Sequence, residues 1–381
     1  MVNKNNPNIK QKSLPSLKKD TDTSIEKVIE KYLVKNAEQV DKELHEYLAV
    51  KANPRYIENL IGKAGFKYDT DAITKSILEP SWYLLKLGGK RFRPALTRLV
   101  LETYGKNSLD YIEFAIIPEV IHNSTLIKDD IEDGSDVRRG APAVHVHFGL
   151  DVAANASDFM YFFPMKALVD SSKLSAEVKN RASILYFTDM TRISIGQATD
   201  LAWHRGMVDI RNITVDQYLE MARDKTGVLT GFAMALGGIL AGVDSKTESK
   251  LDTIGSLIGV IFQIQDDILN IYPSELSTNK GGVGDDISEG KITLMVIHAL
   301  QNASEEDKEK LIGILSEHTK DKKKISEAIT LIGKYGSVEY ARTKAEEIEK
   351  EVIDLISSTL QESEAKEILK NLVHYLIIRN K

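Results

Sequence analysis

The residues best suited to chemistry form an acidic cluster, Asp129-Asp130-Ile131-Glu132-Asp133, shortly after a run of apolar residues. On a helix, Asp129, Asp130 and Asp133 fall within an arc of roughly 100 degrees and project to one side. Carboxylates held so close together repel one another unless a cation neutralises them. Carboxylate oxygens without histidine or thiolate suit Mg²⁺, which keeps waters and takes substrate phosphates as further ligands. A solvated acidic helix end explains this segment, taken alone, equally well.

A second acidic pair, Asp266 and Asp267, lies near the end of another apolar helical stretch that closes at Asn270. Because a long hydrophobic face leads into this pair, a solvated helix end explains it less well than a buried site does. Two acidic helices that face each other would form a metal-lined mouth above an apolar interior. Such a mouth suits a substrate with a diphosphate head and a hydrocarbon tail.

Two groups of basic residues supply the cations that such a substrate needs. Lys90, Arg91 and Arg93 crowd beside a glycine pair, and Arg138 and Arg139 follow the first acidic cluster. Arginine offers paired donors to phosphate and lysine a point charge. Each group alone is equally well explained as a basic surface loop. The chain has no GxxxxGK[ST] motif before these residues, so a P-loop nucleotide enzyme is not expected.

The composition limits the classes of protein that remain. The chain has 381 residues, of which 42% are hydrophobic, enough for a substantial core. Its net charge of -6 argues against general nucleic-acid binding. It has no cysteine, which excludes disulfides, thiolate metal sites and cysteine nucleophiles, and the cytoplasm is the expected location. Residues 1–20 are expected to form a flexible basic tail, since they lack the apolar core of a secretory signal.

The elements that position these residues are predicted to be helices, in a single all-α domain over residues 21–381. The uncharged stretch Thr226 to Val243 has the minimum length of a membrane span. Its five glycines and its closely flanking charges favour a helix buried inside the domain, so no transmembrane span is predicted. Only Val144 to Phe148 alternates like a strand. Within that segment, His145 and His147 are expected to be structural residues in a loop.

From about Asp71 to the C-terminus, the sequence resembles the trans-isoprenyl diphosphate synthases. Within that family it looks most like the eukaryotic-type geranylgeranyl diphosphate synthases, because of IHNSTL before the first cluster, FMYFF at Phe159, and Asn270 closing the second motif. The motifs that carry the family resemblance are GGKRFRP at Gly88, DDIED at Asp129, RRG at Arg138, GQATD at Gly196, KTG at Lys225, FQIQDD at Phe262, GDDISEGK at Gly284 and YGSVEYA at Tyr335.

The resemblance implies an all-α fold of long antiparallel helices around a central cavity, assembled as a homodimer or a higher homo-oligomer. It implies condensation of isopentenyl diphosphate with an allylic diphosphate (dimethylallyl, geranyl or farnesyl), assisted by about three Mg²⁺ ions per active site. The implied metal ligands are Asp129, Asp130, Asp133, Asp266 and Asp267. The resemblance implies that the allylic diphosphate is contacted by Arg138, Lys225 and Lys291. It implies that isopentenyl diphosphate is contacted by Lys90, Arg93, His122 and Arg139. The developing carbocation is expected to face Thr226 and Gln263. Lys225, Thr226, Gln263 and Lys291 are thus the expected catalytic residues.

Product length is expected to depend on the residues below the first acidic cluster. Ser124 and Thr125 lie about one helical turn before Asp129 and are small, so they should leave the cavity open. The resemblance places Tyr161 and Phe162 at the floor of the cavity, which predicts mainly the twenty-carbon geranylgeranyl product. Ordinary core packing is the alternative explanation of this aromatic run.

Three alternatives remain open beside this prediction. The first is a synthase of a different chain length, farnesyl or longer than geranylgeranyl. The second is a class I terpene cyclase, which has no need of a second diphosphate site at Lys90 and Arg93. The third is a non-catalytic partner subunit, which typically lacks the aspartates. Asn270 stands where many relatives carry a third aspartate, so the metal should bind more weakly there.

Overall fold

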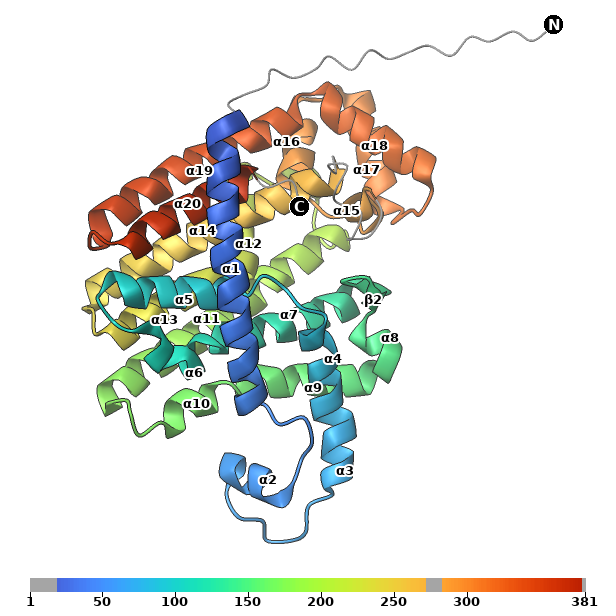
Figure 1. The fold of residues 1–381 in the computed structure, drawn as a ribbon. Helices are drawn as coiled ribbons and strands as arrows, with labels where there is room; N and C mark the ends of the chain where they lie inside the picture. Colours follow the sequence, from blue (N-terminus) through green and yellow to red (C-terminus); the bar gives the residue numbers. More distant parts are fainter. Residues whose placement is uncertain (1–18, 272–282, 379–381) are drawn as a thin grey trace, which may run out of the picture.

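The structure is a computed structural model that describes residues 19–271 and 283–378 (Figure 1). In these ranges the elements are helical apart from two short antiparallel strands, β1 (Val137–Arg138) and β2 (Ala141–Pro142), which confirms the all-α prediction. The expected tail falls almost wholly outside the described residues. The α-helices are α1 (Lys19–Tyr47), α2 (Pro54–Ile61), α3 (Thr70–Ile73), α4 (Glu79–Lys86), α5 (Phe92–Thr103), α6 (Ile112–Ala115), α7 (Ile117–Asp133), α8 (Val144–Phe148), α9 (Leu150–Phe162), α10 (Met165–Asp170), α11 (Ala176–His204), α12 (Val215–Ala222), α13 (Val228–Ala241), α14 (Ser245–Ile271), α15 (Asp285–Ser288), α16 (Leu294–Asn302), α17 (Glu305–Ser316), α18 (Lys322–Lys334), α19 (Ser337–Thr359) and α20 (Glu364–Ile378).

The centre of the fold is the helix pair α13 and α14, with α5 and α11 packed against α13 and α19 packed against α14 (Figure 1). Glycines allow the pair to pack closely: a Cβ atom at Gly255 would lie 2.4 Å from the carbonyl oxygen of Thr230. Every residue from Val228 to Leu240 is buried, so the uncharged stretch is a core helix, as predicted. Among the described helices, α14 alone is long and apolar enough to span a membrane, and 61% of its most apolar window is buried.

The strand-like alternation of Val144 to Phe148 is misleading, because this segment forms helix α8. Its backbone makes helical hydrogen bonds, including one from the His147 amide to the Ala143 carbonyl at 3.0 Å. Val144 is buried, and the His147 ring stacks on Tyr83 with ring centroids 4.7 Å apart. Five residues are too few to distinguish the helical periodicity of apolar residues from the strand periodicity, so packing decides the conformation. His145 and His147 are therefore on a helix rather than in the expected loop.

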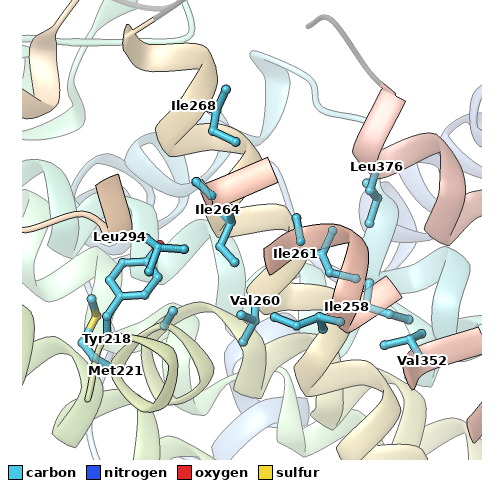
Figure 2. Close-up of a cluster of buried hydrophobic side chains, with 14 of the residues drawn as sticks. Tyr218, Met221, Ile258, Val260, Ile261, Ile264, Ile268, Leu294, Val352 and Leu376 are labelled. Atoms are coloured by element: carbon cyan, nitrogen blue, oxygen red, sulfur yellow. The ribbon is translucent and has the colours of Figure 1, made fainter. Parts of the chain in front are cut away.

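Two helix ends bring the acidic clusters to the site. Helix α7 ends at Gly134, whose φ of 65° closes the helix directly after Asp133. On α14 an apolar face formed by Ile258, Ile261 and Ile264 leads up to the second acidic pair (Figure 2). The buried face holds α14 against its neighbours, so the polar end of the same helix is fixed in position.

A π-helical segment, Arg223–Gly227, joins α12 to α13. Its extra residue per turn changes the direction in which Lys225 and Thr226 point, a feature often found at functional sites. Gly196 on α11 lies against this segment, and a Cβ atom there would approach the Lys225 backbone nitrogen to 2.3 Å. The glycine of the GQATD motif therefore lets α11 pack directly against the KTG motif.

Candidate active site

The first acidic cluster is neutralised in part by Arg138, which lies on strand β1. Its Nε donates to Asp130 Oδ1 at 2.7 Å, its Nη2 contacts the same oxygen, and Nη2 lies 3.8 Å from Asp129 Oδ2. Asp130 is fully buried, and this burial raises its pKa despite the guanidinium. Burial acts against ionisation of Asp129 as well, but Lys225, Lys291 and Arg138 outweigh it and lower the pKa of that carboxyl.

Two partly buried lysines connect the elements of the site. Lys225 Nζ lies 3.2 Å from Asp129 Oδ1 and 2.5 Å from Asp200 Oδ2. Lys291 Nζ lies 3.1 Å from Asp133 Oδ2, 2.5 Å from Glu289 and 3.8 Å from Asp286. Both ammonium groups thus lie against the carboxylates of α7. The structure brings together the three cations that the sequence assigned to the allylic diphosphate.

Asp267 of the second acidic pair belongs to a chain of hydrogen bonds. Tyr218 donates its hydroxyl to Asp267 Oδ2 at 2.7 Å, and Gln263 Nε2 donates to Asp267 Oδ1 at 2.8 Å. Thr226 in turn donates to Gln263 Oε1 at 2.7 Å. Burial raises the pKa of Asp267 to about 7. The predicted residues Thr226 and Gln263 are therefore in contact, and both oxygens of Asp267 accept hydrogen bonds.

Asn270 has a role in folding the segment that carries Lys291. Its side-chain oxygen accepts a hydrogen bond from the Asp286 amide at 3.1 Å, and its carbonyl accepts one from the Gly284 amide at 3.0 Å. Asp286 is at the start of α15, and burial raises the pKa of its carboxyl to about 8. The amide in place of a third aspartate therefore joins α14 to the GDDISEGK motif.

Arg93 of the GGKRFRP motif and Arg139 of the RRG motif lie near His122. Among the described residues, no carboxylate lies within ion-pair distance of Lys90, Arg93 or Arg139, and Arg93 Nε has no hydrogen-bond partner. Burial lowers the pKa of Arg93 to about 10. Burial and the neighbouring cations Arg93 and Arg139 lower the pKa of His122 well below its usual value, so the imidazole is neutral near pH 7.

Arg91, which lies between Lys90 and Arg93 in the sequence, differs from them because it has carboxylate partners. Its guanidinium is buried and contacts Asp41 at 2.8 Å and Glu119 at 2.9 Å. It also donates to the Leu85 carbonyl at 2.8 Å. Because each of its three nitrogens already donates to the protein, we assign Arg91 to holding α1 and α7 to the GGKRFRP loop rather than to a ligand. Lys90 has a looser contact, 3.0 Å to the hydroxyl of Tyr375.

The donor set fits a hard cation in its chemistry. Asp130 Oδ2 and Asp133 Oδ1 are buried carboxylate oxygens that have no hydrogen-bond donor. Such oxygens are costly to bury unless an ion or a water satisfies them. In residues 19–271 and 283–378, no three acidic or histidine side chains converge closely enough to hold an ion as they stand. Lys225, Lys291 and Arg138 lie against those carboxylates, so binding of an ion would require side chains to rearrange.

The four residues predicted to control chain length do not share one environment. Ser124 is buried where α7 meets α9 and donates to the Ser157 carbonyl at 2.7 Å, while Thr125 donates to the His122 carbonyl at 2.8 Å. Tyr161 is partly buried against the core. Phe162 is 68% exposed, so its predicted position at the floor of this chain's own cavity is wrong. The two aromatics are adjacent on α9 and point to different sides of the helix.

Several residues that complete the site were not singled out from the sequence. Asp200 holds Lys225, Tyr218 holds Asp267, and Asp286 with Glu289 surrounds Lys291. Gln197 donates to Glu132 at 2.7 Å. Four of these five residues lie inside the GQATD and GDDISEGK motifs, which marked the segments but gave the individual side chains no role. Tyr218 lies in no quoted motif.

Comparison with known proteins gives a consistent result. The model of the polyprenyl synthetase family matches residues 74–332. A short chain isoprenyl diphosphate synthase of Methanothermobacter thermautotrophicus is 35% identical over 313 residues, 81% of this chain and 92% of its own. A geranylfarnesyl diphosphate synthase of Aeropyrum pernix is 34% identical over 306 residues, 79% of this chain and 93% of its own. The crystal structure of geranylgeranyl pyrophosphate synthetase from Pyrococcus horikoshii superposes with a TM-score of 0.79 and 29% identity, covering 93% of this chain and 99% of that one.

Proposed function

The chain belongs to the polyprenyl synthetase family and is an isoprenyl diphosphate synthase, and we propose that it makes mainly geranylgeranyl diphosphate from two separately bound diphosphates. The observation that carries this proposal is the division of cations into two groups. We call Asp129, Asp130, Asp133, Arg138, Lys225 and Lys291 the allylic half. We call Lys90, Arg93, His122 and Arg139 the isopentenyl half.

In the allylic half, the proposed first step is cleavage of the carbon–oxygen bond of the allylic diphosphate. Arg138, Lys225 and Lys291 would move from the carboxylates to the diphosphate oxygens and stabilise the negative charge that grows on them. Asp129, Asp130 and Asp133, with Asp266 and Asp267 opposite, would hold Mg²⁺. The bound metal would supply further stabilisation of the leaving group. Asp130 and Asp133 each have a buried carboxylate oxygen that accepts no hydrogen bond, which supports this assignment.

In the isopentenyl half, Arg93, Arg139 and Lys90 would bind the second diphosphate. The lack of carboxylate partners for Arg93 and Arg139 in the described chain supports this role, because cations that lie together are costly to remove from water without an anion. Lys90 is exposed beside them in the sequence. The neutral imidazole of His122 would add a hydrogen bond rather than a charge. The two diphosphate sites would orient the double bond of isopentenyl diphosphate toward the allylic carbon. Holding the two reactants in this geometry would accelerate the condensation.

Thr226 and Gln263 are proposed to face the carbocation that forms between the two halves. The bond from Thr226 to Gln263 and the bond from Gln263 to Asp267 fix both side chains before substrate arrives. Fixed polar groups of this kind stabilise developing charge without reorganising. A diphosphate oxygen would remove the final proton, so the site needs no protonated or basic histidine.

Tyr161 is the residue that we propose as the floor of the hydrocarbon cavity. Its backbone carbonyl accepts a hydrogen bond from Tyr186 at 2.7 Å, and the Lys128 ammonium lies 5.1 Å from its ring centroid. The Tyr161 side chain packs against the core cluster that includes Tyr186 of α11. Tyr161→Ala should lengthen the product, whereas Phe162→Ala, at the exposed neighbour, should leave it unchanged. Equal products from both variants and the wild type would remove Tyr161 from the floor.

A homodimer through α11 is also proposed. The outward side of this helix carries no charge over four turns, and Phe187 is 66% exposed. Phe187→Asp should halve the mass measured by sedimentation, and Met207→Asp, at another exposed residue, should not. The uncharged exposed residues of this side are Ile184, Phe187, Thr188, Thr191, Ser194, Ile195 and Ala198.

The decisive test of the proposed activity is a condensation assay. Purified protein is incubated with Mg²⁺, radiolabelled isopentenyl diphosphate and dimethylallyl, geranyl or farnesyl diphosphate, and the products are separated by chain length. Label should enter a twenty-carbon product with each primer. Cyclised hydrocarbon without incorporated label would identify a terpene cyclase, and absence of turnover with every primer would contradict the proposal.

A further inference from the structure

An arm formed by residues 49–69 leaves unusually large apolar side chains in water. It contains α2 and the loop that leads to α3, and in Figure 1 it extends below the helical body. Phe66 is 93% exposed and Ile61 is 71% exposed. We call residues 49–69 the α2 arm. Exposed apolar groups on a protruding segment mark a surface that another body covers.

The α2 arm is fixed at its base. Trp82 donates its indole N–H to the Ala49 carbonyl at 3.1 Å, and the Ala52 amide donates to Thr74 Oγ1 at 2.9 Å. On α2 itself the side chain of Asn53 caps the first turn, and Ile57 is buried. The inner side of the arm is therefore used in packing, and Ile61 and Phe66 are held outward by an ordered scaffold.

The charge of the α2 arm is opposite to that of the whole chain. The chain carries a net charge of -6, whereas the arm has four basic and only two acidic residues. The four basic side chains are exposed, and none makes an ion pair within the described ranges. They lie on both sides of Ile61 and Phe66 in the sequence. The basic residues are Lys51, Arg55, Lys63 and Lys67, and the acidic ones are Glu58 and Asp69.

We propose that the α2 arm docks this protein on an anionic lipid surface. Phe66 and Ile61 would insert at the level of the lipid headgroups, and Lys63 and Lys67 would contact the headgroup phosphates. Apolar insertion and attraction to anionic lipid are the two contributions that reversible peripheral binding requires. The site would then lie near the membrane, into which a long prenyl diphosphate partitions by its tail.

A second copy of the chain fits the α2 arm less well than a lipid surface does. Two arms of the same positive charge repel each other when they meet across a symmetry axis. The side of α11 described above has the uncharged character expected of self-association, and it is a different part of the molecule. The inference does not depend on product length, since it concerns residues outside both halves of the site.

The test is cosedimentation of the full chain with vesicles. Neutral vesicles contain phosphatidylcholine alone, and anionic vesicles contain equal parts of phosphatidylcholine and phosphatidylglycerol. Three variants are compared with the wild type: Ile61→Asp with Phe66→Asp, Lys63→Glu with Lys67→Glu, and the control Met207→Asp, which removes an exposed apolar side chain elsewhere. Circular dichroism and condensation activity without vesicles confirm that each variant is folded.

The wild type and Met207→Asp should bind the anionic vesicles and not the neutral ones. Each of the two arm variants should bind the anionic vesicles at least roughly tenfold more weakly than the wild type. Added salt should release the wild type from these vesicles. Failure of the wild type to bind anionic vesicles would overturn the proposal, as would arm variants that bind like the wild type. A lower oligomeric mass in the arm variants would overturn it in favour of a contact between copies. Condensation activity is scored separately, so its loss would not be mistaken for loss of docking.

Discussion

Arg138, Lys225 and Lys291 in the allylic half each contact at least one carboxylate, whereas Arg93 and Arg139 in the isopentenyl half contact none in the described chain. The first group is neutralised internally and must exchange partners before it can bind a diphosphate. The second group has no carboxylate partner that it would have to leave before it could bind a diphosphate. The two groups of cations therefore differ in whether carboxylates of the protein contact them.

This difference has a physical consequence for metal dependence. In the allylic half a diphosphate arriving alone would meet carboxylates as well as cations, and the like charges would repel. Asp129, Asp130 and Asp133 would hold Mg²⁺, whose charge would offset this repulsion, and the three cations could then leave the carboxylates for the diphosphate. In the isopentenyl half no carboxylate has to be displaced. Dependence on metal should therefore belong to one half of the site and not to the other.

The largest effect is expected from Asp130→Ala in the allylic half. Removing this proposed metal ligand should take stabilisation away from the leaving group, and kcat should fall by about a thousandfold or more. Initial rates of condensation at saturating Mg²⁺ measure this. Glu132→Gln is the matched control, since Glu132 is in the same helical turn but contacts Gln197. A comparable loss in both variants would mean that the cluster as a whole is structural.

Arg91→Ala tests whether position within the GGKRFRP loop predicts function. Because this variant leaves Glu119 buried without its ion pair, the free energy of unfolding should fall by about 3 kcal/mol or more. Urea denaturation measures the loss, and the Michaelis constants of the folded fraction should stay close to those of the wild type. A selective rise in the Michaelis constant for isopentenyl diphosphate would place Arg91 in the isopentenyl half after all.

Arg93→Ala should affect substrate binding rather than stability, the opposite of Arg91→Ala. Loss of a charge-assisted contact to phosphate should raise the Michaelis constant for isopentenyl diphosphate by about tenfold to a hundredfold. Stability should change little or improve, because a partly buried cation without an ion-pair partner is removed. Steady-state kinetics with each substrate varied in turn separates the two cases. An equal rise for the allylic substrate would contradict the division into halves.

The smallest effect concerns His122 and pH. The pKa of His122 is lowered in the folded protein, so below about pH 6.5 the unfolded chain binds more protons than the folded one. This contribution to stability is present above pH 6.5 and is lost as the pH falls toward the folded pKa. His122→Gln should therefore weaken the decline of stability between pH 7 and pH 5, as followed by urea denaturation. An unchanged pH dependence would show that burial and the neighbouring cations do not lower the pKa of His122.

The sequence predicted that the first acidic cluster and Arg138 lie together, because these residues are close in the chain. Asp129, Asp130 and Asp133 share one helical face, and Arg138 follows within a few residues. Their mutual contact needs only the helix and a short β-hairpin. Burial of α13 was equally predictable, since eighteen uncharged residues with five glycines favour a core helix.

Contacts that depend on packing between distant elements were not predictable in the same way. Asp41 and Arg91 are fifty positions apart, and nothing in the sequence distinguishes Arg91 from Arg93 before α1 and α7 are in place. Phe162 illustrates the same limit, because the direction of a side chain depends on the rotation of α9 against its neighbours. Asn270 was expected to weaken a metal site, whereas its observed contacts are with the backbone of Gly284 and Asp286.

The most direct test of the division into two halves is calorimetric titration of the wild type with each diphosphate, with and without Mg²⁺. Isopentenyl diphosphate is one ligand, and a non-reactive thiolo analogue of farnesyl diphosphate is the other. The account predicts that isopentenyl diphosphate binds with similar affinity under both conditions and that the allylic analogue binds only when Mg²⁺ is present. An equal requirement for Mg²⁺ by both ligands, or metal-free binding of the allylic analogue, would contradict it.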